Sequence, residues 1–530
     1  MVRVREAEER DVAGIRDVFL ATYGEDYAYP QYYDPYLLKK MVFSDDTLLL
    51  VAEEEDSGRV LGTASVVLQI GAFADLVGEF GRLAVDPVAR GQGIGHLLME
   101  NRIARVADRL HVGLVEPKVN HLFSQKITFG HGFKPLGLLP LNLRFGTSRE
   151  SAGLCVRYFG DALQLRRNHP RVLPETAVLA ELVMGELDID CDVIVDGDAA
   201  PYPYDEDFEI EELASNGYAS LLRCERGRVR HREVFGPVRL HYGMFKLQAS
   251  HAHYLLAREK GRIVGAVGFI IDEIEYAVRI FELISVTDRP LRFLLQQVLD
   301  RCRDRWNTAY VEVDVNADSP RMQRSLFELG FLPVAYVPAM VFHEVERLDV
   351  VRMVRLLVPP HFDDVVCEPV LEPVISLVTS SFATAYAAPQ LRRNMERVGL
   401  LQGMTKEQVD QLAAISSIET FAPNQVIVRE GEQDEKMRVL LQGHALVSLN
   451  GAGDRPVAEI GAGSSIGEMS LLTTAPHSAT VVAQDHLETV VFSHTGLESL
   501  VRRRPDVGLR IYRNLATGLG EKLRHADAGL

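Results

Sequence analysis

Apolar residues along the first 145 positions fall into runs that alternate between strand-like and helix-like spacing. Short apolar runs at 47–52, 60–69 and 80–85 predict strands, and the polar turn between the first two predicts a hairpin. A helix is predicted over 93–110 from apolar residues near helical spacing: Leu97, Leu98, Ile103, Val106 and Leu110. This alternation predicts a mixed α/β domain.

The same order of elements returns about 200 residues later. A predicted hairpin at 252–271 is followed by a strand at 281–286 and a helix at 291–306. Both copies end on a glycine followed by a phenylalanine, at Gly132-Phe133 and Gly330-Phe331. These parallels predict an internal duplication.

The patterns divide the chain into five segments. They are a first copy at 1–145, a bridging α/β segment at 146–204, a second copy at 205–358, a linker at 359–389 and a C-terminal domain at 390–530. In the last segment, short β-runs between glycine turns predict a small β-barrel (jelly-roll), with flanking helices at 391–415 and 495–524. The predicted fold class is therefore α/β (α+β) tandem folds followed by a small barrel.

Composition narrows the classes of protein that the chain can represent. Its 530 residues include 57 Lys and Arg against 74 Asp and Glu, a formal charge of −17. A net acidic chain is poorly suited to nucleic acids or anionic membranes, whose binding depends on neutralising phosphates. We therefore expect neither as a partner, although a local site for one small phosphate ligand stays open.

Targeting and metal signals are weak. No apolar run approaches the roughly 18–20 residues that span a bilayer, and the charged N-terminus is unlike a signal peptide. The five cysteines are far apart and form no Cys-x-x-Cys pair, which excludes a zinc ribbon. We expect a cytoplasmic protein without membrane segments and without a metal site.

A glycine-rich turn at 90–95 lies between a predicted strand and a predicted helix. Glycines let backbone N–H groups approach a ligand closely, and a helix start adds unpaired donors and a positive dipole end. The turn therefore predicts a diphosphate-binding site. It lacks the Lys-Ser/Thr of a Walker loop, and five residues separate strand from glycines, which fits a Rossmann turn badly.

Residues 83–95 read Leu-Ala-Val-Asp-Pro-Val-Ala-Arg-Gly-Gln-Gly-Ile-Gly and resemble the acyl-CoA motif of the GNAT superfamily of N-acetyltransferases. The resemblance implies that acetyl-CoA, or another acyl-CoA, is the donor. It implies that the pyrophosphate binds backbone amides of the turn, from Arg90, Gly91, Gly93, Ile94 and Gly95. Amides near Leu83 and Val85 would then hold the acetyl carbonyl and its developing negative charge.

Catalytic groups are less clearly marked. Glu79, at the start of the same strand, is a candidate general base, with a solvated strand-end carboxylate as the alternative reading. The family's usual acid, a tyrosine five residues before the Gly-Phe pair, is replaced by Thr128. His121 and His131 fit packed or surface histidines better than catalytic ones, and Ser124 is a weak candidate for the cofactor arm.

The second copy resembles the same superfamily but lacks the phosphate turn. Where the glycines should stand, residues 286–293 contain none, so close backbone approach to a diphosphate is blocked. We interpret this copy as catalytically inactive, with a role in walling the substrate site or relaying a signal. Arg289 and Arg292 could bind an anion, although arginines at a helix start are more often solvated.

The C-terminal segment resembles the cyclic-nucleotide-binding domain of catabolite activator proteins and regulatory kinase subunits. The match lies at 466–481, over the phosphate cassette, and implies cAMP or cGMP as regulator. The implied pocket residues are Gly467, Glu468, Ser470, His477, Ala479 and Thr480. His477 stands where the family has an arginine, and histidine offers weaker, pH-dependent contacts to phosphate.

These features predict an acetyl-CoA-dependent N-acyltransferase regulated by a C-terminal sensor domain. The acceptor is a protein lysine or a small amine. Two alternatives stay open: a non-catalytic acyl-CoA-binding sensor or scaffold, and a small-amine acetyltransferase with a silent sensor. A homodimer is compatible with the resemblance, because the helix after such barrels often mediates dimers.

Overall fold

The computed structural model describes most of the chain. The described residues are 1–25, 27, 29–69, 76–146, 148–213, 233–236, 240–243, 246–249, 252–362, 364–413, 415–449, 456–469 and 475–528. They form two compact units, one of Met1–Val358 with Phe362–Val378 and one of Pro359–His361 with Thr379–Leu530. No described helix combines the length and apolar character needed to cross a membrane.

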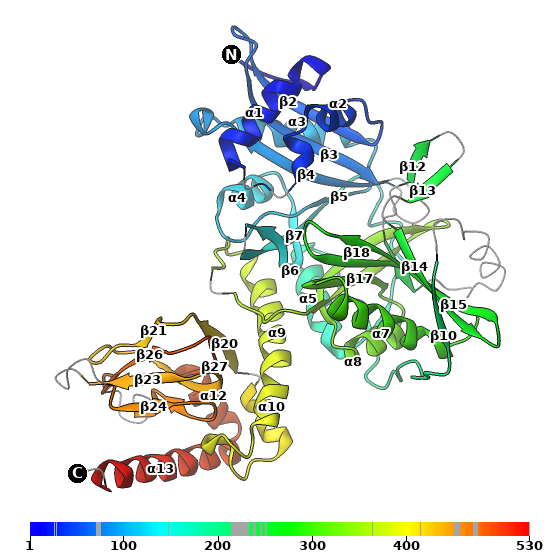
Figure 1. The fold of residues 1–530 in the computed structure, drawn as a ribbon. Coiled ribbons are helices and arrows are strands. Elements are labelled where there is room, and N and C mark those ends of the chain that lie inside the picture. Colours follow the sequence, from blue (N-terminus) through cyan, green and yellow to red (C-terminus); the bar gives the residue numbers. More distant parts are fainter. Residues whose placement is uncertain are drawn as a thin grey trace. The chain divides into compact units, whose positions relative to one another are not determined.

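The first copy is a mixed sheet with helices packed on it (Figure 1). Its elements are β1 (Val2–Glu6), α1 (Val12–Tyr23), α2 (Pro35–Val42), β2 (Thr47–Glu54), β3 (Val60–Gln69), β4 (Val77–Val85), α3 (Ile94–Val106), β5 (Val112–Val115), α4 (Phe123–Gly130), β6 (Lys134–Phe145) and β7 (Ser148–Tyr158). Helix α3 starts one residue after its predicted start and packs its buried residues, such as Leu98 and Val106, against β2, β3 and β4.

The second copy repeats this order. Its elements are β10 (Glu209–Glu212), β11 (Val234–Phe235), β12 (Leu240–Gly243), β13 (Lys246–Ala249), β14 (Ala252–Glu259), β15 (Arg262–Asp272), β16 (Ala277–Ser285), α7 (Arg289–Asp304), β17 (Tyr310–Asn316), α8 (Pro320–Glu328), β18 (Leu332–His343) and β19 (Glu346–Leu356). The predicted strand and helix patterns of both copies are thus confirmed, with shifts of a few residues at their ends.

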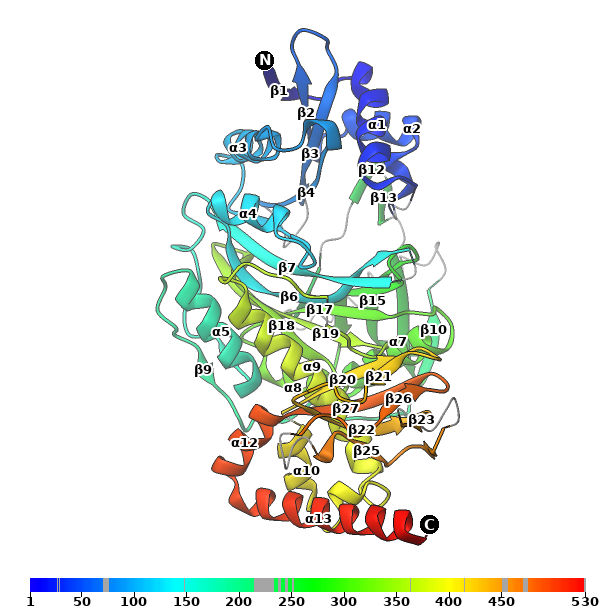
Figure 2. The same ribbon diagram turned by 90° about the vertical axis from the view of Figure 1, so that its left-hand side faces the viewer.

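The two copies share one sheet. Its strand order is β1-β2-β3-β4-β5-β7-β6-β18-β19-β17-β16-β15-β14-β10, so the second copy follows the first in reverse about the β6–β18 pair (Figure 2). One pair of equivalent hydrogen bonds shows how far apart equivalent residues of the two copies lie in the sequence. Val119 N donates to Ser151 O in the first copy, and Ala317 N donates to Asp349 O in the second, so both residues are 198 positions later. The predicted duplication is therefore visible residue by residue.

The seam between the copies is closely packed and strongly polar. Strands β6 and β18 approach so closely at Gly137 that a side-chain Cβ there would lie 2.1 Å from Val334 O. Tyr158 donates a 2.6 Å hydrogen bond to Pro338 O across the seam. Arg347, which is fully buried, donates to the carbonyls of Ala339 and Met340. Satisfied buried polar groups of this kind fix one register, because any slip would leave them unpaired.

The duplication extends beyond the sheets into the bridging segment. That segment contains β8 (Arg171–Val172), α5 (Pro174–Glu186) and β9 (Ile194–Val195), and α5 packs on β18 and β6. Helix α9 (Glu372–Arg393) begins 198 positions after α5. Each repeat therefore consists of a strand–helix fold followed by its own helix.

Each of these following segments is bound by the other copy. Gln323 in α8 accepts a hydrogen bond from Leu173 N, just before α5. Its equivalent Gln125 in α4 accepts from Glu368 N and donates to Val366 O, just before α9. The segment after each copy thus crosses to the opposite copy, which ties the two folds together.

Helix α9 changes the predicted layout around the linker. Most of it falls within 359–389, which the sequence predicted as a linker, and the helix predicted over 391–415 is replaced by the end of α9, a short 3-10 turn and α10 (Lys406–Ala413). Prolines at 359, 360, 369, 373 and 389 dominated the sequence pattern there. Apolar residues such as Val374 and Val378 on α9, and Leu371 just before it, nevertheless become buried and stabilise the helix.

The second unit contains two four-stranded antiparallel sheets in a jelly-roll-like pair, not a closed barrel. The sheets are β20-β27-β22-β25 and β21-β26-β23-β24. Their strands are β20 (Ser416–Phe421), β21 (Val426–Val428), β22 (Lys436–Gln442), β23 (Ala445–Ser448), β24 (Ala458–Ile460), β25 (Ser465–Ile466), β26 (Thr480–Ala483) and β27 (Leu487–Ser493). Helices α12 (His494–Arg503) and α13 (Pro505–Ala528) follow, and Leu497, Leu500 and Ile511 pack with β22 and β27 residues in one core.

We predict that Gly137→Ala destabilises the first unit by about 1–3 kcal/mol, because the added methyl group overlaps the backbone of β18. Thermal unfolding followed by circular dichroism measures the loss. Gly185→Ala in α5 is the matched control, because its Cβ meets no atom within 4 Å and alanine favours helices. Equal melting temperatures for wild type and Gly137→Ala would contradict the close approach at the seam.

Candidate functional site

Strands β4 and β5 separate part of the way along their length. They pair in parallel only from Val77–Phe80 to Val112–Val115, after which β5 ends and β4 continues to Val85. Asp86 N donates to Leu61 O on β3, and successive amides of a strand point to opposite sides. The amides of Val85 and Leu83 therefore face the gap that β5 leaves, where a carbonyl could bind.

The glycine turn opens at the same end of β4. Gly91 and Gly93 have φ values of 80° and 76°, which side chains other than glycine rarely adopt. A Cβ at either position would meet no protein atom within 4 Å, so space for a ligand remains over the turn. Ile94 begins helix α3, and Arg90 is exposed beside the turn. These features fit a pyrophosphate bound by backbone amides.

The surroundings of Gly95 differ from those of Gly91 and Gly93, which have open space. A Cβ there would lie 2.7 Å from Ile127 Cδ1, so a larger residue would require the end of the Ile127 side chain to move. The sequence pattern grouped Gly95 with the ligand-binding glycines. Its small size also serves the close packing of α3 against α4.

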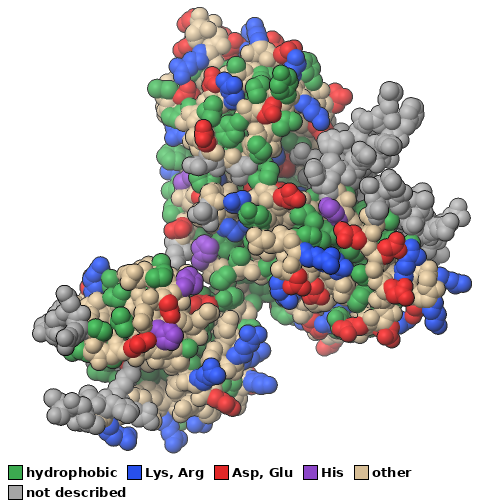
Figure 3. All heavy atoms as spheres, viewed as in Figure 1, with side chains coloured by type: hydrophobic (Ala, Val, Ile, Leu, Met, Phe, Trp, Pro, Cys, Tyr) green, Lys and Arg blue, Asp and Glu red, His purple; other side chains and the backbone are tan. Residues whose placement is uncertain are grey.

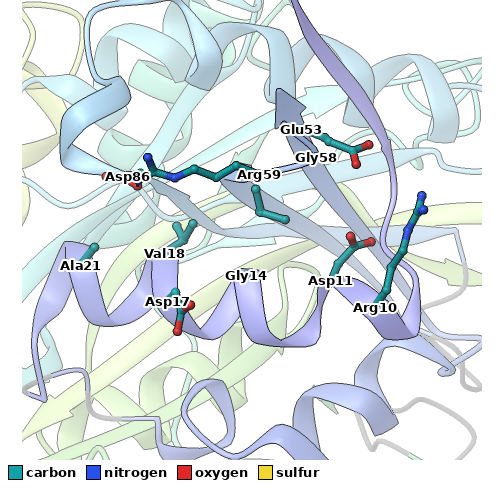
Figure 4. A pocket seen from close by; sticks show the side chains of 11 residues that line it. Arg10, Asp11, Gly14, Asp17, Val18, Ala21, Glu53, Gly58, Arg59 and Asp86 are labelled. Carbon is teal, nitrogen blue, oxygen red and sulfur yellow. The ribbon is translucent and has the colours of Figure 1, made fainter. Parts of the chain in front are cut away.

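Asp86 fixes the start of the turn. Its side chain accepts a 3.0 Å hydrogen bond from Val88 N and pairs with Arg59 of the β2–β3 hairpin at 2.5 Å. Figure 4 shows Arg59 reaching toward Asp86 over a hollow of about 500 Å³, with Asp17 of α1 on the opposite wall. None of the predicted cofactor-binding residues lines this hollow, so we assign it no part in acyl-CoA binding.

The segment across the gap, between β5 and α4, and the first turn of α4 carry polar atoms that have no hydrogen-bond partner among the described residues. They are Asn120 Oδ1 and His121 Nδ1 in the segment and Ser124 Oγ in α4, all inaccessible to solvent. Burial lowers the pKa of His121, so this imidazole is neutral at pH 7. Buried groups without partners cost stability, and a ligand in the gap would supply partners.

Thr128, at the position of the family's usual acid, is buried in the core of the first copy with 1% exposure. His131 lies near His96 instead, with Nε2 3.2 Å from the Nδ1 of that residue, and burial lowers its pKa. Neither residue is placed as a proton donor at the gap between β4 and β5.

Glu79 lies in the paired part of β4. Its carboxylate accepts a 2.9 Å hydrogen bond from Arg82, a residue with a φ of 55° where the β3–β4 register shifts. Arg102 of α3, fully buried, donates to Ser65 O and Gly81 O and so holds this irregular stretch in place. An ion-paired carboxylate is a weaker base than a free one.

Glu116, which the sequence did not single out, is the second carboxylate at the gap. It follows directly after β5 and is accessible to solvent, yet enough protein surrounds it that desolvation raises its pKa to about 7. The charge of nearby Glu79 adds to this shift. No hydrogen bond or ion pair joins Glu116 to another described residue. The sequence alone could not mark Glu116, because its pKa is raised by residues that only the fold brings close to it.

Comparison with the second copy shows what is special about Glu116. The equivalent residue, 198 positions later, is Asp314, which Arg352 binds through two hydrogen bonds of 2.8 and 2.9 Å. The residue equivalent to Arg352 in the first copy is Leu154, which carries no charge. One carboxylate is therefore neutralised within the fold, whereas the other stays available for a ligand.

The second copy has also lost the gap itself. Strands β16 and β17 pair over Ala277–Ile280 and then separate, as β4 and β5 do. Strand β11 fills the opening: its residues Val234 and Phe235 are buried and pair with β17, and Gly236 lies against Phe281 of β16. The absence of a glycine turn and this inserted strand both leave the second copy without room for an acyl-CoA.

The predicted sensor pocket lies around β25 and β26 in the second unit. Gly467, with a φ of 84°, has Lys436 O where a Cβ would be, 2.5 Å away. Glu468 is buried, Ala479 is half-buried, and Thr480 Oγ1 accepts a hydrogen bond from Glu430 N. Ser470 lies outside the described residues.

His477 is held by its backbone on both sides. Its N–H donates to Glu432 O, and its carbonyl accepts from Gly431 N. Its buried Nε2 has no partner among the described residues, and desolvation lowers the pKa of the ring. Arg438, nearby, is already paired with Glu419 and Asp434. A phosphate here would therefore meet a neutral imidazole at pH 7.

Figure 3 shows one face of the molecule, on which Lys and Arg side chains and Asp and Glu side chains are both visible among the described residues.

Two regions of the chain match models of known protein domains, and each region contains one of the two candidate sites. Residues 45–129 match the model of the acetyltransferase (GNAT) domain, and residues 418–504 match that of the cyclic nucleotide-binding domain. The chain thus contains one domain of each kind.

Individual relatives match over shorter stretches. The Pycsar effector protein PaPycTIR of Pseudomonas aeruginosa is 28% identical over 150 residues, which cover 28% of this chain and 48% of the relative. The cyclic AMP receptor protein of Thermus thermophilus is 29% identical over 133 residues, covering 25% of this chain and 60% of the relative. The structure of the ribosomal-protein-S18-alanine N-acetyltransferase from Escherichia coli covers 30% of this chain and 95% of its own, with 14% identity and a TM-score of 0.26. The chain therefore spans about half the length of the two curated relatives.

Proposed function

We propose that the protein is an N-acyltransferase that uses an acyl-CoA donor and an amine acceptor. The observation that carries this proposal is the coincidence of three features at one strand end: the glycine turn, the free amides of Leu83 and Val85, and the unpaired carboxylate of Glu116. Together they provide a diphosphate site, donors for a thioester carbonyl and a base.

In the proposed reaction, the amine nitrogen attacks the thioester carbonyl carbon while the amides of Leu83 and Val85 stabilise the oxygen. Glu116 takes the proton that the ammonium group loses, because its pKa of about 7 lets it be ionised and still basic near neutral pH. The C–N bond forms and the C–S bond breaks. The CoA thiolate leaves and takes the second proton from the nitrogen, so the products are the amide, the CoA thiol and one proton on Glu116. Glu79 and Arg82 keep the charge balance beside the reacting atoms.

We propose that the C-terminal domain regulates this activity by binding a cyclic nucleotide, cAMP or cGMP. Support comes from the contact at the start of α9, where the segment before this helix is bonded to Gln125 of α4. Ser124, one of the residues with an unpartnered polar atom, is the neighbour of Gln125 on the same helix. Suppose that a ligand of the C-terminal domain binds more tightly when this segment is in one position than in another. The ligand then shifts the equilibrium between the two positions by that difference in binding free energy, and the donor site changes with it.

Gly93→Val should abolish acyl-CoA binding, because the branched side chain fills the space over the turn. We expect acetyl-CoA to raise the melting temperature of wild type but not of this variant. Gly24→Val is the control: it also replaces a glycine of positive φ, 62°, in open surroundings, and its ψ of −136°, against 7° at Gly93, makes its backbone strain at least as large. Retained stabilisation of Gly93→Val by acetyl-CoA would refute the assignment of the turn.

Glu116→Gln should lower kcat/KM by about 10²- to 10⁴-fold and remove the rise in rate that wild type shows as pH increases through about 7. Glu79→Gln should keep that pH dependence. Because the pKa of Glu116 is raised on folding, ionising it costs stability between its unfolded value of about 4.5 and 7, so Glu116→Gln should not lower the melting temperature at pH 8. If Glu79→Gln alone removes the pH dependence, the base is Glu79.

His477→Arg should raise the affinity for cAMP or cGMP by about 10-fold or more, because arginine adds a permanent charge and a second donor. In wild type, affinity should increase as pH falls from 8 to 6, since phosphate favours the protonated imidazole and its pKa is lowered in the free protein. Calorimetry at both pH values measures this. The control, His444→Arg, changes an exposed histidine paired with Asp485 and should have no effect. Failure of both nucleotides to bind His477→Arg would overturn the proposed ligand.

A further inference from the structure

Arg102 of α3 is a buried cation that forms no ion pair with any residue the structure describes. It is 1% exposed, and desolvation lowers the pKa of its guanidinium to about 9, which leaves the group charged at pH 7. Its Nη2 donates to Met99 Sδ at 3.2 Å, and its buried Nε has no partner among the described residues. Burying an unpaired charge costs stability, so this arginine calls for a role that an apolar residue could not fill.

The remaining guanidinium nitrogen of Arg102, Nη1, joins two neighbouring strands. It donates 3.1 Å hydrogen bonds to Ser65 O on β3 and to Gly81 O on β4. Ser65 and Gly81 lie opposite each other, and they form the last regular pair before the register of β3 and β4 shifts. Arg102 therefore holds both strands together at the edge of the irregular stretch.

This irregular stretch is a β-bulge. Two residues of β4, Arg82 and Leu83, lie opposite one residue of β3. Arg82 has a φ of 55°, a left-handed value that a bulge usually gives to glycine. Such a φ strains the backbone of other residues and persists only where neighbouring contacts hold it. The ion pair with Glu79 holds the Arg82 side chain, and Arg102 holds the backbone immediately before it.

The bulge governs the amides that face the gap between β4 and β5. Successive residues of a strand point in opposite directions, so one additional residue inverts the alternation beyond it. Asp86 N donates to Leu61 O on β3, which leaves the amides of Val85 and Leu83 on the side of the gap. Leu83 is itself part of the bulge, so the direction of its amide depends directly on the backbone that Arg102 holds.

The second copy has no arginine at the equivalent position. A Cβ on either of two equivalent glycines, on β3 and β15, would meet two residues of the following helix, which aligns α3 with α7. These contacts are Gly62 with Ile94 and Leu98, and Gly265 with Pro290 and Leu294. Residues of α7 thus lie 196 positions after their equivalents in α3. The equivalent of Arg102 is Val298, which is buried and has no side-chain donor.

The left-handed bulge is also confined to the first copy. Tyr276 has a positive φ like its equivalent Leu76, whereas Glu282, the equivalent of Arg82, has none. The register of β15 and β16 shifts at Phe281 instead. The arginine on the helix, the left-handed residue and the open gap therefore occur together in the first copy, and the second copy lacks all three.

We infer that Arg102 is a positioning residue for acyl transfer, which holds the β4 bulge so that the Leu83 amide points at the thioester carbonyl. This inference rests on the proposed acyltransferase function and adds to it a residue outside the gap. Arg102 acts through backbone carbonyls and not through contact with the donor. Its replacement should therefore change how the bound thioester is polarised, while the glycine turn still binds the pyrophosphate.

The test uses Arg102→Met in the full-length protein, with acetyl-CoA labelled with carbon-13 at the carbonyl. Binding to wild type should move the infrared band of the labelled carbonyl to lower wavenumber, and Arg102→Met should lose about half of this shift or more. The Kd for acetyl-CoA, measured by calorimetry, should change by less than about 10-fold. With n-butylamine as the probe acceptor, kcat should fall by about 10²-fold.

Arg105→Met is the matched control. Arg105 lies on the same helix and donates to the backbone and side-chain oxygens of Asn101, within α3. This variant should keep the carbonyl band, the Kd and kcat of wild type. A shift of the band in both variants would show a general effect of arginine loss from α3 and would overturn the inference.

Arg102→Lys keeps the charge but lacks the planar guanidinium, and its carbonyl band should lie between those of wild type and Arg102→Met. If Arg102→Met does not fold, Arg102→Lys decides, and a wild-type band in that variant overturns the inference. An unchanged band in a folded Arg102→Met overturns it as well, and so does a loss of affinity that accounts for the whole loss of kcat/KM. Failure of wild type to bind acetyl-CoA overturns the proposed function instead, so the two failures are distinguishable.

Discussion

The pairing of β6 with β18 is the contact on which the first unit depends. It requires a residue without a side chain at Gly137, and it makes one sheet from two copies that would otherwise have separate edges. Because the copies are joined back to back, the β15–β16 turn of the second meets the β6–β7 hairpin of the first. A local constraint on backbone distance thus decides which distant parts of the chain lie against each other.

The two copies show how one fold diverges after duplication. At equivalent positions, Glu116 stays exposed to solvent while Asp314 is neutralised by Arg352, and the gap that stays open in the first copy is filled by β11 in the second. The second copy keeps its hydrophobic core and its place in the sheet. It therefore contributes to the stability of the first copy, while the position equivalent to the open gap is buried protein interior.

Much of the fold and part of the site could be predicted from the sequence, because the information was local. The strand and helix runs, the glycine turn around Gly93 and the cassette containing His477 each lie within one short stretch. Glu116 and Arg102 could not be found in this way, since their importance comes from desolvation by the whole fold or from hydrogen bonds to strands earlier in the chain. Motif spacing also could not show that Gly95 lies against Ile127 of α4, because this contact exists only in the folded chain.

Helices α5 and α9 are equivalent in the two repeats, and α9 leads from the tandem fold to the C-terminal domain. Helix α5 has 13 residues and α9 has 22, yet both begin at the same point of their repeat. The C-terminal domain therefore did not need a new connector: it extends an element that each repeat already possessed. A domain attached through this helix shares its anchorage on the opposite copy, so the connection is stiffer than a flexible tether would be.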